Sequence, residues 1–127
     1  MIEIKDLKKS FDGVEVLKGI STNFETGKVN LIIGQSGSGK TVFLKSLLNV
    51  YQPTSGEILF DGRDINKMGR EDKQQLRSEI GTVFQGSALF DSMTVEENIT
   101  FPLDMFTNLS FREKKRRAFE VIGRVHL

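Results

Sequence analysis

The sequence contains no cysteine and only one histidine, His126, among its 127 residues. Without cysteine, neither a disulfide framework nor a thiolate metal site can form, and a single histidine makes a histidine-based metal site implausible. No apolar run approaches the roughly 18 residues that a membrane span needs, and residues 1–6 lack the apolar core of a signal peptide. We therefore expect a cytoplasmic protein whose link to any membrane comes through a partner.

An excess of charge of one sign is also missing, because 18 basic residues balance 17 acidic ones and leave a formal net charge of +1. Nothing in this balance requires nucleic acid or a membrane surface as a partner. The hydrophobic share of 38% and the charged share of 28% are typical of one soluble globular domain. No stretch rich in glycine, serine or proline divides the chain.

The most informative stretch runs from Gly34 to Thr41 and reads Gly-Gln-Ser-Gly-Ser-Gly-Lys-Thr. It fills all four fixed positions of the phosphate-binding pattern G-x-x-x-x-G-K-[ST]. An apolar run at 29–33 precedes it and a helical pattern at 42–48 follows it, which predicts a buried strand, a glycine loop and a helix. A glycine-rich connection without a ligand is the alternative. A dinucleotide-binding G-x-G-x-x-G fits less well, since its glycine spacing differs.

The residue types in this stretch suit a cradle for phosphate groups. Gly34, Gly37 and Gly39 would let backbone N–H groups turn inward around an anion, with the positive end of a helix dipole behind them. Lys40 would reach the β- and γ-phosphates, and the Thr41 hydroxyl would complete the shell of a Mg²⁺ ion. The candidate cofactor-binding residues of this stretch are Gly34, Gln35, Ser36, Gly37, Ser38, Gly39, Lys40, Thr41 and Val42.

Two strands are predicted before this loop. Alternating apolar residues predict a short strand over 2–7 and a longer one over 14–24, with Asp12-Gly13 as the turn of an antiparallel pair. Phe11 lies beside that turn, where an aromatic ring either covers a small core or serves as a platform for a planar ligand. Its position alone favours the core.

A second hairpin is predicted after the loop, where residues 57–60 read as a strand and Asp61-Gly62 as a tight turn. Asp61 also follows an apolar run, as a Mg²⁺-binding aspartate does in many P-loop enzymes. A hairpin tip is the favoured interpretation, because the apolar run is only three residues long and a turn-forming glycine follows it.

The remaining chain predicts one strand and three helices. Residues 71–78 are polar and predicted to be helical, and 80–84 predict a second buried strand that ends at Gln85. Capping-box sequences at Thr94 and Ser110, each with a glutamate three residues later, predict that two further helices begin there.

On the last of these helices the apolar residues share one face, and the basic residues cover most of the rest. The basic cluster could contact phosphates, although the neutral overall balance favours a solvated face. The apolar set is Phe111, Ala118, Phe119, Ile122 and Val125, and the basic set is Arg112, Lys114, Lys115, Arg116 and Arg117.

Taken together, the two opening strands, the loop at 34–41 and the segment 84–98 resemble the ATP-binding subunits of ABC transporters, and the match covers the whole chain. The resemblance implies that Phe11 stacks on adenine, which reverses the preference drawn from its position alone. It also implies that Val16 packs on the same adenine ring.

The resemblance further implies a role for Gln85 near Mg²⁺ and the attacking water, where it responds to the membrane partner. Lys40 and Gln85 are therefore the candidate catalytic residues, and Thr41 and Gln85 are the candidate metal ligands.

A narrower likeness concerns residues 34–45, 84–95 and 101–103, which look like the ATPase of lipid-trafficking ABC systems of the Mla type. Such systems move phospholipid or related lipid between membranes, together with a permease and a lipid-binding MCE-domain protein. The alternative is that these segments satisfy only the general ABC pattern.

The chain departs from the family because it lacks the signature segment Leu-Ser-Gly-Gly-Gln, the later strand ending in Asp-Glu, and the switch histidine. Residues 109–110 begin like the signature but continue with Phe111, and His126 comes too early to be the switch histidine. The resemblance thus implies the amino-terminal part of one ABC ATPase domain. About 1–85 would form the ATP-binding core, and about 86–127 the Q-loop and the start of the helical subdomain.

The implied fold is α/β, a P-loop NTPase of the ABC nucleotide-binding type with an antiparallel strand layer beside a parallel core sheet and a truncated helical subdomain. The implied function is an ATP-binding subunit that powers a transporter by ATP hydrolysis, with ATP and Mg²⁺ as cofactors. A second ATPase subunit and a membrane permease would be its partners on the inner face of the cell membrane, without nucleic acid.

Two alternatives to a transporter subunit stay open. One is a soluble ABC-type ATPase that acts on nucleic acid or ribosomes, and the other is a nucleotide-binding fragment without activity. We expect the 127-residue chain alone to bind ATP weakly or not at all and not to hydrolyse it, since the later aspartate and glutamate are missing.

Overall fold

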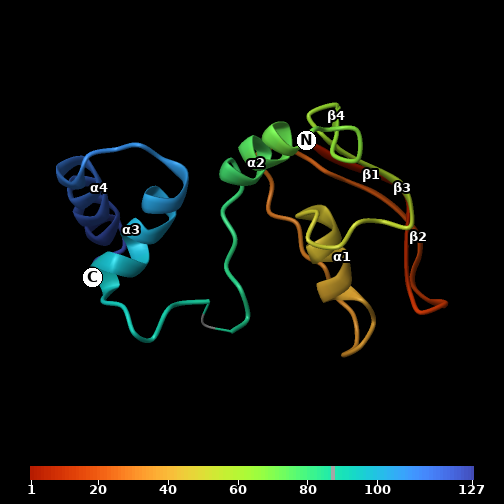
Figure 1. Cartoon of the computed structure of the whole chain (residues 1–127). Helices are drawn as coiled ribbons and strands as arrows, with labels where there is room; N and C mark the ends of the chain where they lie inside the picture. The colour runs from red at the N-terminus through yellow and green to blue at the C-terminus, as the bar shows by residue number, and fades with distance from the viewer. Residues whose placement is uncertain (87) are drawn as a thin grey trace. The chain divides into compact units, whose positions relative to one another are not determined.

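The computed structural model describes residues 1–86 and 88–127, which form two compact units, Met1–Gly81 and Thr82–Leu127 (Figure 1). Ser87, which belongs to the segment behind the lipid-system likeness, lies outside the described residues.

A four-stranded antiparallel sheet organises the first unit. Its strands are β1 (Ile2–Phe11), β2 (Val14–Phe24), β3 (Ser55–Phe60) and β4 (Arg63–Asp64), in the order β2-β1-β3-β4. The predicted turn at Asp12-Gly13 is confirmed, with φ of 48° and 80°, as the two-residue turn that matches strand twist requires. The predicted antiparallel pair at the start of the chain is therefore confirmed.

Two helices complete the first unit and contribute to its core. α1 (Lys40–Leu47) buries Phe43, Ser46 and Leu47, which lie three and four residues apart and so share one helical face, and α2 (Arg70–Ser78) buries Leu76. The core thereby holds α1, and with it the loop that precedes α1. The buried apolar residues are Ile4, Leu7, Leu17, Phe43, Leu47, Ile58, Phe60, Ile65 and Leu76.

The two buried strands predicted at 29–33 and 80–84 are wrong for the described residues, because both segments are coil. The Leu31 side chain is 84% exposed and Val83 is fully exposed, where burial was expected. A strand exists only where a neighbour completes its hydrogen-bond ladder, and neither segment pairs with a strand of the described sheet. The antiparallel layer is therefore present, whereas the predicted parallel core sheet is not formed by residues 1–86 and 88–127.

The second hairpin is confirmed, with β3 and β4 joined by Asp61-Gly62 at φ of 48° and 78°. The Asp61 carboxylate accepts a hydrogen bond from the Met1 ammonium group, and this bond lowers the pKa of Asp61 from its ordinary value. The Asp61 backbone N–H also donates to the Met1 carbonyl, at 2.9 Å. These contacts agree with the hairpin interpretation of Asp61 and not with the metal-ligand one.

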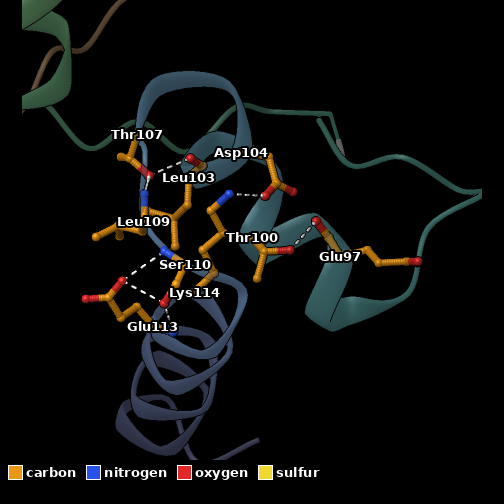
Figure 2. Close-up of polar contacts among 9 residues, drawn as sticks. All are labelled: Glu97, Thr100, Leu103, Asp104, Thr107, Leu109, Ser110, Glu113 and Lys114. Carbon is orange, nitrogen blue, oxygen red and sulfur yellow. Dashed lines mark hydrogen bonds and ion pairs between the residues drawn. The ribbon is translucent and has the colours of Figure 1, made fainter.

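The second unit contains the helices α3 (Val95–Phe106) and α4 (Phe111–Arg124) (Figure 1). Both predicted capping boxes are confirmed. The Thr94 N–H donates to the Glu97 carboxylate at 2.7 Å, and the Glu97 N–H donates to the Thr94 hydroxyl at 3.2 Å. Ser110 and Glu113 make the same reciprocal pair (Figure 2).

The turn between these helices is held by short polar contacts, which Figure 2 shows. The Thr107 hydroxyl donates to the Leu103 carbonyl at 2.6 Å, and the Lys114 ammonium pairs with the Asp104 carboxylate at 2.8 Å. Lys115 lies 3.9 Å from the Glu96 carboxylate. Two of the basic residues of α4, Lys114 and Lys115, thus face acidic residues of α3. This arrangement favours the interpretation of the basic cluster as a solvated helix face over its interpretation as a phosphate site.

The predicted apolar face of α4 is mostly uncovered. Ala118 is buried, but Phe111 is 78% exposed, and Phe119 and Val125 are exposed as well. Periodicity groups such residues on one face, but burial needs a partner surface, and among the described residues of α4 it is Ala118 that is buried. Among the described residues, no helix is long and apolar enough to cross a membrane.

The capping box of α4 gives a testable pH dependence. Hydrogen bonds from the Ser110 hydroxyl and N–H hold the pKa of Glu113 below its ordinary value. Because this pKa is lowered in the folded state, the stabilisation is complete above the ordinary glutamate pKa of about 4.3 and is lost as the pH falls through the lowered value. An NMR titration should give a lower pKa for Glu113 in the parent than in Ser110→Ala, because the alanine variant loses the hydroxyl donor and keeps the backbone N–H donor. Equal pKa values in both proteins would contradict the assignment.

Candidate functional site

The candidate site is the loop 34–39, which leads into α1 (Figure 1). Gly37 and Gly39 have φ of 76° and 96°, in the left-handed region that glycine adopts at little cost. Gly39 caps α1, and its carbonyl accepts the first helical hydrogen bond, from the Phe43 N–H at 2.8 Å. Free N–H groups of the first turn therefore lie at the loop, as anion binding at a helix N-terminus requires.

Close packing constrains Gly34, and it constrains Gly39 as well. A Cβ atom at Gly34 would lie 2.6 Å from the Ser38 hydroxyl oxygen. A Cβ atom at Gly39 would lie 3.3 Å from Val16 Cγ1 and from Leu17 Cδ2. The helix end of the loop is therefore packed directly against β2, which fixes its position relative to the sheet.

The Lys40 side chain crosses back over the loop. Its ammonium donates to the Gly34 carbonyl at 2.7 Å and to the Gln35 carbonyl at 2.8 Å, while the Ser38 N–H donates to the same Gln35 carbonyl at 3.1 Å. A positive charge is thereby held at the start of the loop, close to the positive end of the α1 dipole. Both features attract an anion to this place.

These residues fit a polyphosphate ligand, because the donor set consists of backbone N–H groups and one ammonium, with left-handed glycines between them. Thr41 lies exposed in the first turn of α1, where its hydroxyl would hold Mg²⁺ beside phosphate oxygens. Within residues 1–86 and 88–127, no group of three or more histidine, cysteine, aspartate or glutamate residues could hold a metal ion. Val42 is half-buried and packs on the core.

The residues assigned to adenine lie at two places of the first unit. Val16 is half-buried and lies beside Gly39, so it is brought to the phosphate loop. Phe11 is half-buried at the end of β1, outside the buried core, and its ring pairs edge to face with Tyr51 at a centroid distance of 5.2 Å. Gln85 is exposed in the coil of the second unit.

Two residues near Phe11 escaped the sequence analysis. Besides Tyr51, the Lys9 ammonium lies 4.9 Å from the centroid of the Phe11 ring. Lys9 could have been noticed, since residues two apart on a strand share a face. No local signal points to Tyr51, because its contact with Phe11 joins segments that are far apart in the sequence.

A hollow of about 460 Å³ is lined by residues of β2, the coil 31–34, the loop residues Ser38 and Gly39, and the start of α1. Its walls are mostly apolar side chains, among them Ile20, Phe24 and Phe43, with Lys40 at its edge. Apolar walls of this kind favour contact with further apolar side chains, whereas a charged triphosphate would lose its hydration there. We therefore place the candidate phosphate site at the loop itself.

Comparisons of the sequence with known proteins point to one family. The family model described as "ABC transporter" matches residues 17–127. The chain is 40% identical to the "Probable ribonucleotide transport ATP-binding protein mkl" of Mycobacterium leprae, over 99% of this chain and 36% of that protein. It is 37% identical to the "Methionine import ATP-binding protein MetN 1" of Rhodococcus jostii, over 100% of this chain and 38% of that protein.

Two solved structures of ATP-binding cassette proteins are similar to the chain in fold. The chain is similar to the ATP-binding cassette MJ0796, whose dimer was solved with ADP and Pi, with a TM-score of 0.83 and 29% identity over 100% of this chain and 58% of that one. It is also similar to cbiO1 from Clostridium perfringens, described as part of the transporter complex cbiONQ, with a TM-score of 0.83 and 31% identity over 99% of this chain and 50% of that one.

The chain spans little more than a third of the length of the curated relatives it matches. Within that span the chain shares its fold with the two solved structures, at TM-scores of 0.83. The chain belongs to the ABC transporter family and has the fold of its ATP-binding domain.

Proposed function

We propose that the protein is the ATP-binding subunit of an ABC transporter and powers transport by ATP hydrolysis. The observation that carries this proposal is the loop 34–41, in which left-handed glycines, the N-terminus of α1 and the Lys40 ammonium converge on one place. Membership of the ABC transporter family supports the same function.

In this proposal each part of the site has one task. The N–H groups of the loop bind the phosphates, and Lys40 turns from the Gly34 and Gln35 carbonyls toward the β- and γ-phosphates. Phe11 and Val16 hold the base. Mg²⁺, when bound, would neutralise phosphate charge, and Thr41 would be its ligand from the loop.

Gln85 is proposed to act at the attacking water and at the surface that senses the permease. Its exposure leaves the side chain amide accessible to such partners. We propose that two copies of the complete protein bind ATP together and act with a membrane permease at the inner face of the cell membrane. The dimeric state of MJ0796 and the assignment of cbiO1 to a transporter complex support this proposal by similarity.

The transported substrate is a finer proposal. The segments 34–45, 84–95 and 101–103 favour a lipid-trafficking system of the Mla type, with an MCE-domain partner. The names of the relatives support transport but mention ribonucleotide and methionine, so they add nothing to the lipid hypothesis.

Replacing Lys40 tests the phosphate loop. Lys40→Ala should weaken MgATP binding by about 1.5–3 kcal/mol, the range for hydrogen bonds to charged groups, or roughly ten- to a hundredfold. Calorimetry on the complete protein measures this loss of binding free energy. Lys28→Ala is the matched control, because Lys28 is an exposed lysine of the same unit that pairs with Glu25. Equal affinity of Lys40→Ala and the parent would remove the proposed site.

Replacing Gln85 tests its assignment. Gln85→Ala should leave ATP affinity nearly intact and lower permease-stimulated turnover, because the residue acts at the water and the coupling surface. Gln74→Ala, at an exposed glutamine of α2, should change neither quantity. Phosphate release measured with and without the permease decides between the assignments. A large rise in the dissociation constant with unchanged turnover would contradict the role given to Gln85.

Isolation of the complete protein with its partners tests the substrate class. A lipid system should yield a permease together with an MCE-domain protein. Recovery of a periplasmic amino-acid-binding or sugar-binding protein in place of the MCE-domain protein would contradict the lipid hypothesis and favour an importer.

A further inference from the structure

Phe11 lies where a side chain is difficult to hold in one orientation. It is the last residue of β1, and the tight turn at Asp12-Gly13 follows at once. The ring is half-buried and lies outside the buried core, so close packing on all sides does not fix its rotamer. A stacking platform nevertheless needs a defined ring plane.

Two contacts from other residues define that plane. The Tyr51 ring lies 5.2 Å from the Phe11 ring, centroid to centroid, with 79° between the two planes, an edge-to-face pair. The Lys9 ammonium lies 4.9 Å from the Phe11 centroid and donates a hydrogen bond to the Gln52 carbonyl at 2.9 Å. The segment that carries Tyr51 therefore supports Phe11 through both contacts.

The segment 51–54 is itself tied to β1 by its backbone. The Thr54 N–H donates to the Lys8 carbonyl at 2.9 Å, and the Ser10 N–H donates to the Thr54 hydroxyl at 3.0 Å. With the Lys9 bond to Gln52, three hydrogen bonds join this segment to the end of β1. The place of Tyr51 beside Phe11 is thus fixed by the fold and does not depend on the aromatic contact alone.

The same tyrosine is also linked to the helix that carries the phosphate loop. Its N–H donates to the Lys45 carbonyl at 3.2 Å, and the Lys45 ammonium lies 5.3 Å from the centroid of the Tyr51 ring. α1 begins at Lys40 and contains Lys45, which contacts Tyr51. Tyr51 therefore links the helix behind the candidate phosphate site to the Phe11 ring, which is proposed to bind the nucleotide base.

We propose that Tyr51 is a positioning residue for the nucleotide base, which holds the Phe11 ring in the plane on which the base stacks. This inference rests on the proposed function, since it needs Phe11 to bind the base. Tyr51 acts through Phe11 and lies outside the loop 34–41, so its effect is confined to ligands that carry a base.

The test compares two ligands on the complete protein, MgATP and magnesium tripolyphosphate, by calorimetry. Tyr51→Ala should lower the affinity for ATP about two- to tenfold, the range of an edge-to-face aromatic pair. The affinity for tripolyphosphate should stay unchanged. Tyr51→Phe, which keeps the ring edge, is the matched control and should bind ATP as the parent does.

A double-mutant cycle with Phe11 tests whether Tyr51 acts through that ring. Phe11→Ala should weaken ATP binding at least as much as Tyr51→Ala, and the double variant should be no weaker than Phe11→Ala alone. Additive losses would overturn the inference, as would an equal loss for ATP and tripolyphosphate or an unchanged ATP affinity in Tyr51→Ala.

If the parent binds neither ligand, the proposed function fails and the inference fails with it. If the parent binds both and Tyr51→Ala binds ATP normally, the inference alone fails.

Discussion

The close packing of α1 and its first residues against the antiparallel sheet is the constraint on which the site depends. Burial of Phe43 and Leu47 contributes about 1.5–3 kcal/mol each, the usual gain for a large apolar side chain. Gly39 lies so near Val16 and Leu17 that a Cβ atom would fill the remaining space. The helix end with its free N–H groups is thereby held in one place before any ligand arrives, and such preorganisation lowers the cost of binding.

The same unit carries an apolar segment, residues 29–33, that has no strand beside it in the described part of the chain. Residues 29–33 hold apolar side chains in the pattern of a buried strand, and the apolar hollow borders them. In the described residues Val29, Leu31 and Ile33 are exposed. Exposed apolar surface beside an unpaired backbone favours association, so this segment is the weak point of the unit.

Local chemistry explains which features were predictable from the sequence. The turns at 12–13 and 61–62 and both capping boxes depend on residues a few positions apart, and the glycine loop that leads into α1 follows a fixed spacing. The burial of 29–33 and of the apolar face of α4 depends on a covering surface, which periodicity does not supply. The contact between Phe11 and Tyr51 is also non-local, since it needs the register that brings 51–54 to the end of β1.

The central claim is that the loop and the first turn of α1 bind the phosphates of a nucleotide. Backbone amide NMR of the complete protein during titration with MgATP, and separately with magnesium tripolyphosphate, tests it most directly. The claim predicts that both ligands shift the amide signals of residues 34–42 most strongly, because these N–H groups would contact the phosphates. Unchanged signals in this range, with the largest shifts in α3 or α4, would contradict it.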